Sequence, residues 1–165
     1  MNINKLRKFD INNGVGIRLS IWTAGCSHKC KGCWNKELWN PENGKPYKEW
    51  KAEIEEALKD DNIDGVSILG GEPLFELMEH NKKDDIVDLL NLCNVYHKSI
   101  WMWTGYEFEE VPQFIKDRCS VIITGKFEED KKTDDLSLYK GSTNQKFNYK
   151  YLSDTEAKYL KIKKY

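Results

Sequence analysis

The sequence lacks several features that mark whole classes of protein. No apolar run comes close to the roughly 18 consecutive residues that would span a membrane. The 26 lysines and arginines are balanced by 27 aspartates and glutamates, so the basic excess typical of a general nucleic-acid binder is missing. The first ten residues are polar and contain no apolar signal core. These absences predict a cytoplasmic protein with neither a membrane nor a nucleic-acid partner.

Common catalytic motifs are missing as well. The chain has no P-loop, no Ser-His-Asp set and no zinc-protease motif. A Gly-x-Gly pair at 14–16 stands before the first expected strand, whereas a dinucleotide-binding fingerprint follows one. No repeat or low-complexity tract interrupts the 165 residues, of which 12% are aromatic. We therefore expect a single folded domain over 1–165, with 146–165 as a loosely ordered, lysine-rich C-terminal tail.

The pattern of apolar residues predicts alternating strands and helices. Ile17, Leu19 and Ile21 alternate with Arg18 and Ser20, a period of two that is typical of a strand over 17–22. Shorter apolar runs predict further strands, and helical spacing of apolar residues predicts amphipathic helices. The expected strands lie at 66–69, 100–103 and 121–123, and the expected helices lie at 46–58, 86–93 and 112–118.

This order of elements favours an α/β fold with a mostly parallel sheet and right-handed crossovers. The pattern alone fits both a doubly wound sheet and an incomplete barrel. In either fold, functional sites form at the carboxyl ends of the parallel strands. Each unusual motif of the chain directly follows an expected strand. We therefore expect one pocket that is lined by the segments 26–33, 70–73, 104–106 and 125–127.

The cysteines number 5, an odd count that argues against a disulfide framework. Cys26, Cys30 and Cys33 have the spacing C-x3-C-x2-C, whereas we expect Cys93 and Cys119 to be small buried hydrophobic residues. A zinc site needs a fourth protein ligand, and the histidine at 28 is poorly placed to supply it. Three thiolates around a 4Fe–4S cluster would leave one iron free to bind something else. By spacing alone, a zinc knuckle and an electron-transfer cluster stay open as alternatives.

A Gly-Gly-Glu-Pro motif at 70–73 follows the expected strand at 66–69. Gly70 and Gly71 would let the backbone approach a ligand closely, and the carboxylate of Glu72 can accept hydrogen bonds from an ammonium group. By itself, the motif also fits an ordinary turn from a strand to a helix. Trp34 directly follows the last cysteine of the triplet, and without the cysteines we would expect it in the core.

Together, the cysteine triplet and the Gly-Gly-Glu-Pro motif resemble those of the radical S-adenosylmethionine enzymes. The resemblance implies an incomplete (β/α) TIM-like barrel and a 4Fe–4S cluster whose open iron is chelated by S-adenosyl-L-methionine. It also implies that reduction of the cluster cleaves this cofactor to a 5′-deoxyadenosyl radical, so that no side chain acts as a catalytic acid or base. By this resemblance the metal ligands are Cys26, Cys30 and Cys33, and the cofactor-binding residues are Gly32, Cys33, Trp34, Gly70, Gly71 and Glu72.

Six segments, in the same order, are similar to the glycyl-radical activases that serve anaerobic ribonucleotide reductase. They are 13–18, 25–35, 70–74, 101–106, 125–127 and 140–145. This resemblance implies that the chain generates a glycyl radical on the large subunit of that reductase, with a low-potential electron donor such as flavodoxin. Val15, Thr124 and Lys140 stand where this family commonly has Pro, Asp and Arg.

Other functions stay open at this point. A formate-lyase-type activase shares the first three of these segments, and a small-molecule radical enzyme shares the cluster motif. A non-catalytic iron–sulfur or zinc module is an alternative from a different class. Glu72 with its two glycines favours an enzyme, because a passive module has no need of a site for the amino group of a cofactor. The segments 101–106 and 140–145 favour the reductase activase.

Overall fold

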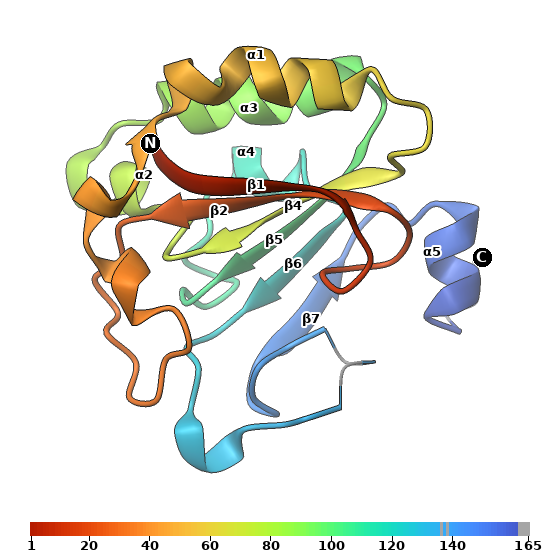
Figure 1. Cartoon of the computed structure of the whole chain (residues 1–165). Helices are drawn as coiled ribbons and strands as arrows, with labels where there is room; N and C mark the ends of the chain where they lie inside the picture. The colour runs from red at the N-terminus through yellow and green to blue at the C-terminus, as the bar shows by residue number, and fades with distance from the viewer. Residues whose placement is uncertain (136, 138, 162–165) are drawn as a thin grey trace.

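A seven-stranded sheet forms the centre of the molecule (Figure 1). The computed structural model describes residues 1–135, 137 and 139–161. The strands are β1 (Asn2–Asp10), β2 (Arg18–Ala24), β3 (Lys45–Pro46), β4 (Gly65–Gly70), β5 (Ser99–Thr104), β6 (Val121–Thr124) and β7 (Lys146–Tyr149). The helices are α1 (Tyr47–Leu58), α2 (Phe75–His80), α3 (Asp84–Val95), α4 (Gln113–Lys116) and α5 (Asp154–Tyr159), with short 3-10 turns η1 (Lys36–Trp39), η2 (Pro41–Asn43) and η3 (Glu129–Lys131). None of the helices in the described residues is both long and apolar enough to cross a membrane.

Four neighbouring strands are parallel, which confirms the expectation of an α/β fold with a mostly parallel core. β2 pairs with β4, β4 with β5 and β5 with β6, with Leu19 opposite Val66 and Trp101 opposite Val121. β1 runs antiparallel to β2, β3 to β1, and β7 to β6. The strand order is β3-β1-β2-β4-β5-β6-β7, and no pairing within the described residues closes the sheet into a ring. The sheet is therefore open, with a parallel centre and antiparallel edges.

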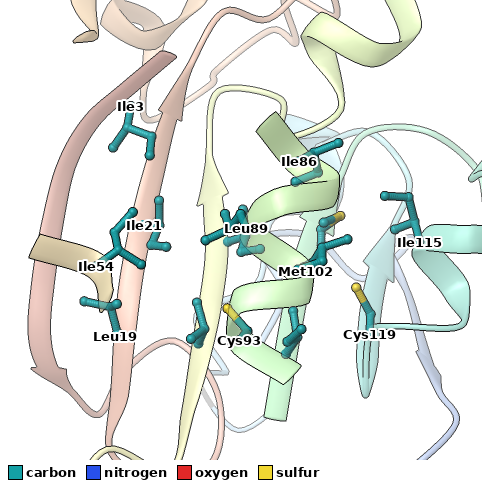
Figure 2. Packing of buried hydrophobic residues seen from close by; sticks show 14 of the residues in the cluster. Ile3, Leu19, Ile21, Ile54, Ile86, Leu89, Cys93, Met102, Ile115 and Cys119 are labelled. Atoms are coloured by element: carbon teal, nitrogen blue, oxygen red, sulfur yellow. The ribbon is translucent and has the colours of Figure 1, made fainter. Parts of the chain in front are cut away.

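Helices α1, α3 and α4 cover one face of the sheet, with α1 and α3 lying side by side (Figure 1). Side chains alternate between the two faces of a strand, so Leu19 and Ile21 of β2 and Met102 of β5 point to this face. Figure 2 shows how these side chains interleave with those of the covering helices. Cys93 and Cys119 are 0% and 3% exposed in this cluster, which confirms that both are buried hydrophobic residues.

The opposite face of the parallel strands is partly polar and rich in tryptophan. Trp101, Val121 and Ile123 form a second apolar cluster, against which Leu160 at the end of α5 packs. Ser20 and Ser67 are fully buried among the alternate residues of β2 and β4. Strands β2, β4 and β5 contribute Trp22, Leu69 and Trp103, respectively, to the wall of a pocket. The face that carries no α1, α3 or α4 therefore bears the pocket.

The apolar pattern does not predict β1, β7 or α5. Only Ile3 and Asp10 of β1 are buried, so its sequence carries little period-two signal. Within the segment 146–165, for which we expect a loosely ordered tail, the structure describes β7 paired with β6 and then α5. A capping box of Ser153 and Glu156 begins α5. Strand pairing and helix capping therefore stabilise these two elements, for which the local apolar pattern gives no signal. Residues 162–165 of the expected tail lie outside the described residues.

Candidate functional site

One pocket of about 420 Å³ lies at the carboxyl ends of the parallel strands. All four segments that we expect to line this pocket contribute side chains or backbone to its wall. The motif residues in its wall are Cys26, His28, Cys30, Cys33, Gly70, Gly71, Thr104, Gly105, Gly125 and Phe127. The loops after β2, β4, β5 and β6 meet here because the strands are parallel and in adjacent order.

The cysteine loop begins where β2 ends and is fixed to the chain that follows it. Gly25 has a φ of +104°, a left-handed conformation that favours glycine. The N–H groups of Gly25 and Cys26 donate to the carbonyl oxygens of Leu38 and Trp39 at 2.8 and 3.1 Å. These bonds tie both ends of the loop together, so the three thiols face the same pocket.

All three cysteines of the triplet are unpaired and partly exposed. Burial raises the pKa of the Cys26 thiol to about 11, against the opposing effect of hydrogen bonds from the backbone N–H groups of His28 and Lys29. Burial also raises the pKa of Cys30, which the backbone N–H of Phe127 opposes. N–H donors directed at cysteine sulfur are a usual surrounding of iron–sulfur clusters.

The donor set fits a 4Fe–4S cluster. No three His, Cys, Asp or Glu side chains of the described residues converge on the position of one metal ion. A cubane takes each thiolate on a different iron and so needs no such convergence. Three free thiols around one pocket, with backbone N–H groups beside the sulfur atoms, are therefore suited to this group.

The two glycines of the Gly-Gly-Glu-Pro motif are needed for packing against the cysteine loop. Gly70 has a φ of +112°, and a Cβ there would lie 2.7 Å from the backbone of Thr23. A Cβ on Gly71 would lie 2.7 Å from the carbonyl oxygen of Gly25. The N–H of Glu72 donates to that same oxygen at 2.8 Å. Close approach of two backbone segments therefore explains both glycines, and it leaves their backbone at the wall of the pocket.

Glu72 is buried, with 1% of its surface exposed, and both carboxylate oxygens are hydrogen bonded. Oε1 accepts from the N–H of Leu74 at 3.0 Å and from the hydroxyl of Thr104 at 2.8 Å. Oε2 accepts from the N–H of Gly105 at 2.8 Å and lies 2.9 Å from His28 Nε2. The carboxylate is thus the centre of a network that joins the loops after β2, β4 and β5.

Trp34 lies at the mouth of the pocket and not in the core. It is 62% exposed, its ring centroid is 5.9 Å from that of Phe127, and Lys132 Nζ stands 5.3 Å above the indole. Gly32 precedes it with a φ of +73°. An exposed indole beside a phenyl ring offers a flat apolar surface on which a nucleobase can stack.

The segment 140–145 contributes Lys140, Gly141 and Gln145 to the wall of the pocket. Gln145 Oε1 accepts from the N–H groups of Gly141 and Ser142 at 2.8 and 3.2 Å, and its Nε2 donates to the carbonyl oxygen of Gly125 at 2.9 Å. Lys140 Nζ donates to the carbonyl oxygens of Thr143 and Gln145. One amide side chain therefore holds this wall against the end of β6.

Comparison with known proteins identifies the family. The family model described as a 4Fe-4S single cluster domain matches residues 12–148. The chain is 34% identical over 150 residues to the anaerobic ribonucleoside-triphosphate reductase-activating protein of Enterobacteria phage T4, covering 88% of this chain and 92% of the relative. It is 36% identical over 157 residues to the protein of that name from Pasteurella multocida, covering 88% and 95%. The match to the Escherichia coli K12 protein is 34% over 156 residues, covering 88% and 96%. The chain belongs to this family of reductase-activating proteins.

The cysteine triplet, the two glycines and Trp34, which the sequence motifs predict for the site, all lie at the pocket. Sequence reasoning misses the residues that hold Glu72, above all His28 and Thr104. The one signal available for His28 is its position between two cysteines of the triplet. No local signal marks Thr104 as a partner of Glu72, because the two residues are 32 positions apart in the chain.

Proposed function

We propose that this chain activates anaerobic ribonucleotide reductase by generating a glycyl radical on the large subunit of that enzyme. The observation that carries the proposal is a set of three unpaired thiols lining one pocket in a member of the reductase-activating proteins. When bound, the 4Fe–4S cluster and S-adenosyl-L-methionine would supply one-electron reductive chemistry that ends in removal of a hydrogen atom from glycine, with the electron coming from a low-potential donor such as flavodoxin. We expect this to take place in the cytoplasm.

The side chains and backbone of the pocket bind and orient. Cys26, Cys30 and Cys33 hold the cluster and leave one iron to the cofactor. The backbone of the segment Gly70, Gly71 and Glu72 receives the methionine amino group, and Gly32, Cys33 and Trp34 line the rest of the cofactor. Support comes from the backbone of both glycines at the pocket wall and from the exposed indole at its mouth.

The open sheet, in this proposal, is an incomplete TIM-like barrel of the radical S-adenosylmethionine type. In a barrel, helices cover the outside of parallel strands, and the site lies at their carboxyl ends. Helices α1, α3 and α4 on one face, and a pocket bordered by Trp22 and Trp103 on the other, match the outside and inside of such a barrel.

The open flank of the barrel admits a loop from another protein. A site that is unfinished on one side cannot enclose a small substrate, but a partner can complete it and exclude water from the radical. The pocket wall includes the exposed Trp34 and the backbone of Gly141. The glycine loop of the reductase large subunit is the substrate that closes it.

The test combines the cluster-loaded chain with a reductant, S-adenosyl-L-methionine and the large reductase subunit. We expect 5′-deoxyadenosine and a stable glycyl radical in electron paramagnetic resonance, in about one-to-one amounts, since each cleavage moves one hydrogen atom. Steady consumption of a small metabolite with no radical on the reductase would replace the activase by a small-molecule enzyme. A radical formed instead on a formate-lyase-type partner would reassign the substrate.

A further inference from the structure

A histidine inside the cysteine loop makes a buried contact. His28 Nε2 lies 2.9 Å from Glu72 Oε2, and the two side chains are 8% and 1% exposed. A carboxylate can only accept hydrogen bonds, so Nε2 is the donor. The imidazole also stands edge-on to Tyr106, with ring centroids 4.6 Å apart. His28 therefore joins the cysteine loop to the segments that follow β4 and β5.

Both oxygens of Glu72 are committed to the protein itself. The described residues supply four donors to them, and a carboxylate has about four lone-pair positions. The Glu72 side chain is not among the described residues that line the pocket, whereas Gly70 and Gly71 are. Direct contact with an ammonium group of a ligand would leave a buried donor of the network without its partner, which is unfavourable.

We infer that Glu72 and His28 are positioning residues for the cofactor site. Through this pair, the loop of the three cysteines is fixed against the carboxyl ends of β4 and β5. The pair thereby sets the separation between the thiols and the backbone of Gly70 and Gly71. The inference rests on the proposed function where the cofactor is concerned, whereas the fixing of the loop does not depend on it.

A second hydrogen bond of the cysteine loop provides a matched control. Ser27 Oγ donates to Glu79 Oε1 of α2 at 2.5 Å, at an exposed position. Water competes for such exposed polar contacts, and they contribute little. Ser27→Ala therefore removes a loop contact but no donor to Glu72, and His80→Ala removes an exposed histidine that makes no hydrogen bond in this network.

Gly105 offers a way to move His28 without removing a polar group. A Cβ at position 105 would lie 2.4 Å from His28 Cδ2 and 2.6 Å from its Nε2, closer than van der Waals contact allows. Gly105 is not among the glycines with positive φ, so alanine adds no left-handed backbone strain there. Gly105→Ala should displace the imidazole while the carboxylate of Glu72 and the hydroxyl of Thr104 remain.

The first experiment measures amide hydrogen exchange over residues 26–33 in the full chain before the cluster is loaded. His28→Ala and Gly105→Ala should each accelerate exchange about tenfold, because the buried tie that opposes local opening is lost. Ser27→Ala and His80→Ala should exchange as the parent does. His28→Gln keeps an N–H donor and should restore most of the protection. Exchange at the parent rate in both His28→Ala and Gly105→Ala would overturn the inference.

The second experiment measures S-adenosyl-L-methionine affinity of the cluster-loaded protein by equilibrium dialysis, together with iron content. His28→Ala should weaken binding about tenfold at unchanged iron content. If Glu72 acts through His28, the double variant with Glu72→Ala should bind no more weakly than Glu72→Ala alone. Additive losses would instead show direct contact by Glu72 and overturn the inference. A parent that binds no cofactor would refute the proposed function, while the exchange experiment would still decide the role of His28.

Discussion

Two buried polar networks lie at opposite ends of the parallel strands, and they are built from different parts of the chain. At the carboxyl ends, Glu72 takes its hydrogen bonds from His28, Leu74, Thr104 and Gly105, which stand in loops or at the last residue of a strand. Loops at this edge of an α/β sheet carry the groups that bind ligands.

At the amino ends, the centre is Arg18, the first residue of β2, which is fully buried. It donates to Ser67 Oγ at 2.6 Å and to the carbonyl oxygens of Val15 before β2, Val66 of β4 and Ser99 of β5. Glu156 of α5 lies 3.7 Å from its guanidinium and accepts the indole N–H of Trp101 at 2.7 Å. Burial lowers the pKa of Arg18 to about 10, and the charge of Glu156 opposes that shift.

The difference separates stability from function. The Arg18 network joins strands and a helix at the amino ends of the strands, and it reaches the pocket wall only at its margin, where Ser67 Oγ donates to the carbonyl oxygen of Asn13. Its loss should therefore lower the stability of the fold more than it alters the site. The Glu72 network joins loops around the pocket, so its loss should alter the site more than the fold. The following changes test this division.

Cys30→Ala should have the largest effect. Iron content after anaerobic reconstitution should fall from about four atoms per chain to none, because the pocket supplies three thiolates and the cluster needs all three. Unfolding of the cluster-free variant by urea should match the parent, since Cys30 is partly exposed. Cys93→Ala is the matched control: it makes the same substitution at a buried cysteine of the core, and it should keep the iron. Iron retained by Cys30→Ala and lost by Cys93→Ala would contradict the ligand assignment.

Glu156→Ala should destabilise the cluster-free chain by about 3 kcal/mol, because it removes the ion-pair partner of the buried Arg18 and leaves Trp101 without an acceptor. Urea unfolding followed by tryptophan fluorescence measures this loss. Cofactor affinity of the folded, cluster-loaded variant should equal that of the parent. A tenfold loss of cofactor affinity without loss of stability would break the division between the two ends.

Trp34→Ala should weaken S-adenosyl-L-methionine binding by about 1–2 kcal/mol, as expected for loss of a base–aromatic stack. Stability should stay within about 0.5 kcal/mol of the parent, because the indole is 62% exposed. Equilibrium dialysis measures the affinity. Tyr151→Ala is the control, since Tyr151 is 66% exposed and does not line the pocket as described. Equal affinity in the two variants would remove Trp34 from the cofactor site.

Glu128→Ala should have the smallest effect. Glu128 pairs with Lys131 on the surface, and water and salt screen such pairs. The urea midpoint should stay within the scatter of repeated measurements of the parent. A clear loss of stability that disappears at high salt would mean that surface charge contributes to the fold in a way that the two buried networks do not account for.

Much of the fold follows from local pattern. The expected helix at 46–58 and strand at 66–69 match α1 and β4 to within a residue or so at each end. Apolar residues at a period of two or near 3.6 mark the elements that bury a face against the core. The apolar pattern does not predict β1 and β7, because they are edge or near-edge strands with few buried side chains. It does not predict α5, because that helix is short.

Local pattern was enough to predict where the unusual motifs lie relative to the strands, because the spacing of cysteines and the ends of strands are local properties. It set the cysteine triplet after β2 and the Gly-Gly-Glu-Pro motif after β4. The contacts of Glu72 depend on the assembled fold, since its partner His28 is 44 positions away and reaches it through strand pairing. The same holds for Arg18 and Glu156, whose pairing depends on where α5 packs. Contacts between residues far apart in the chain depend on how the whole sheet is assembled, and no local period encodes them.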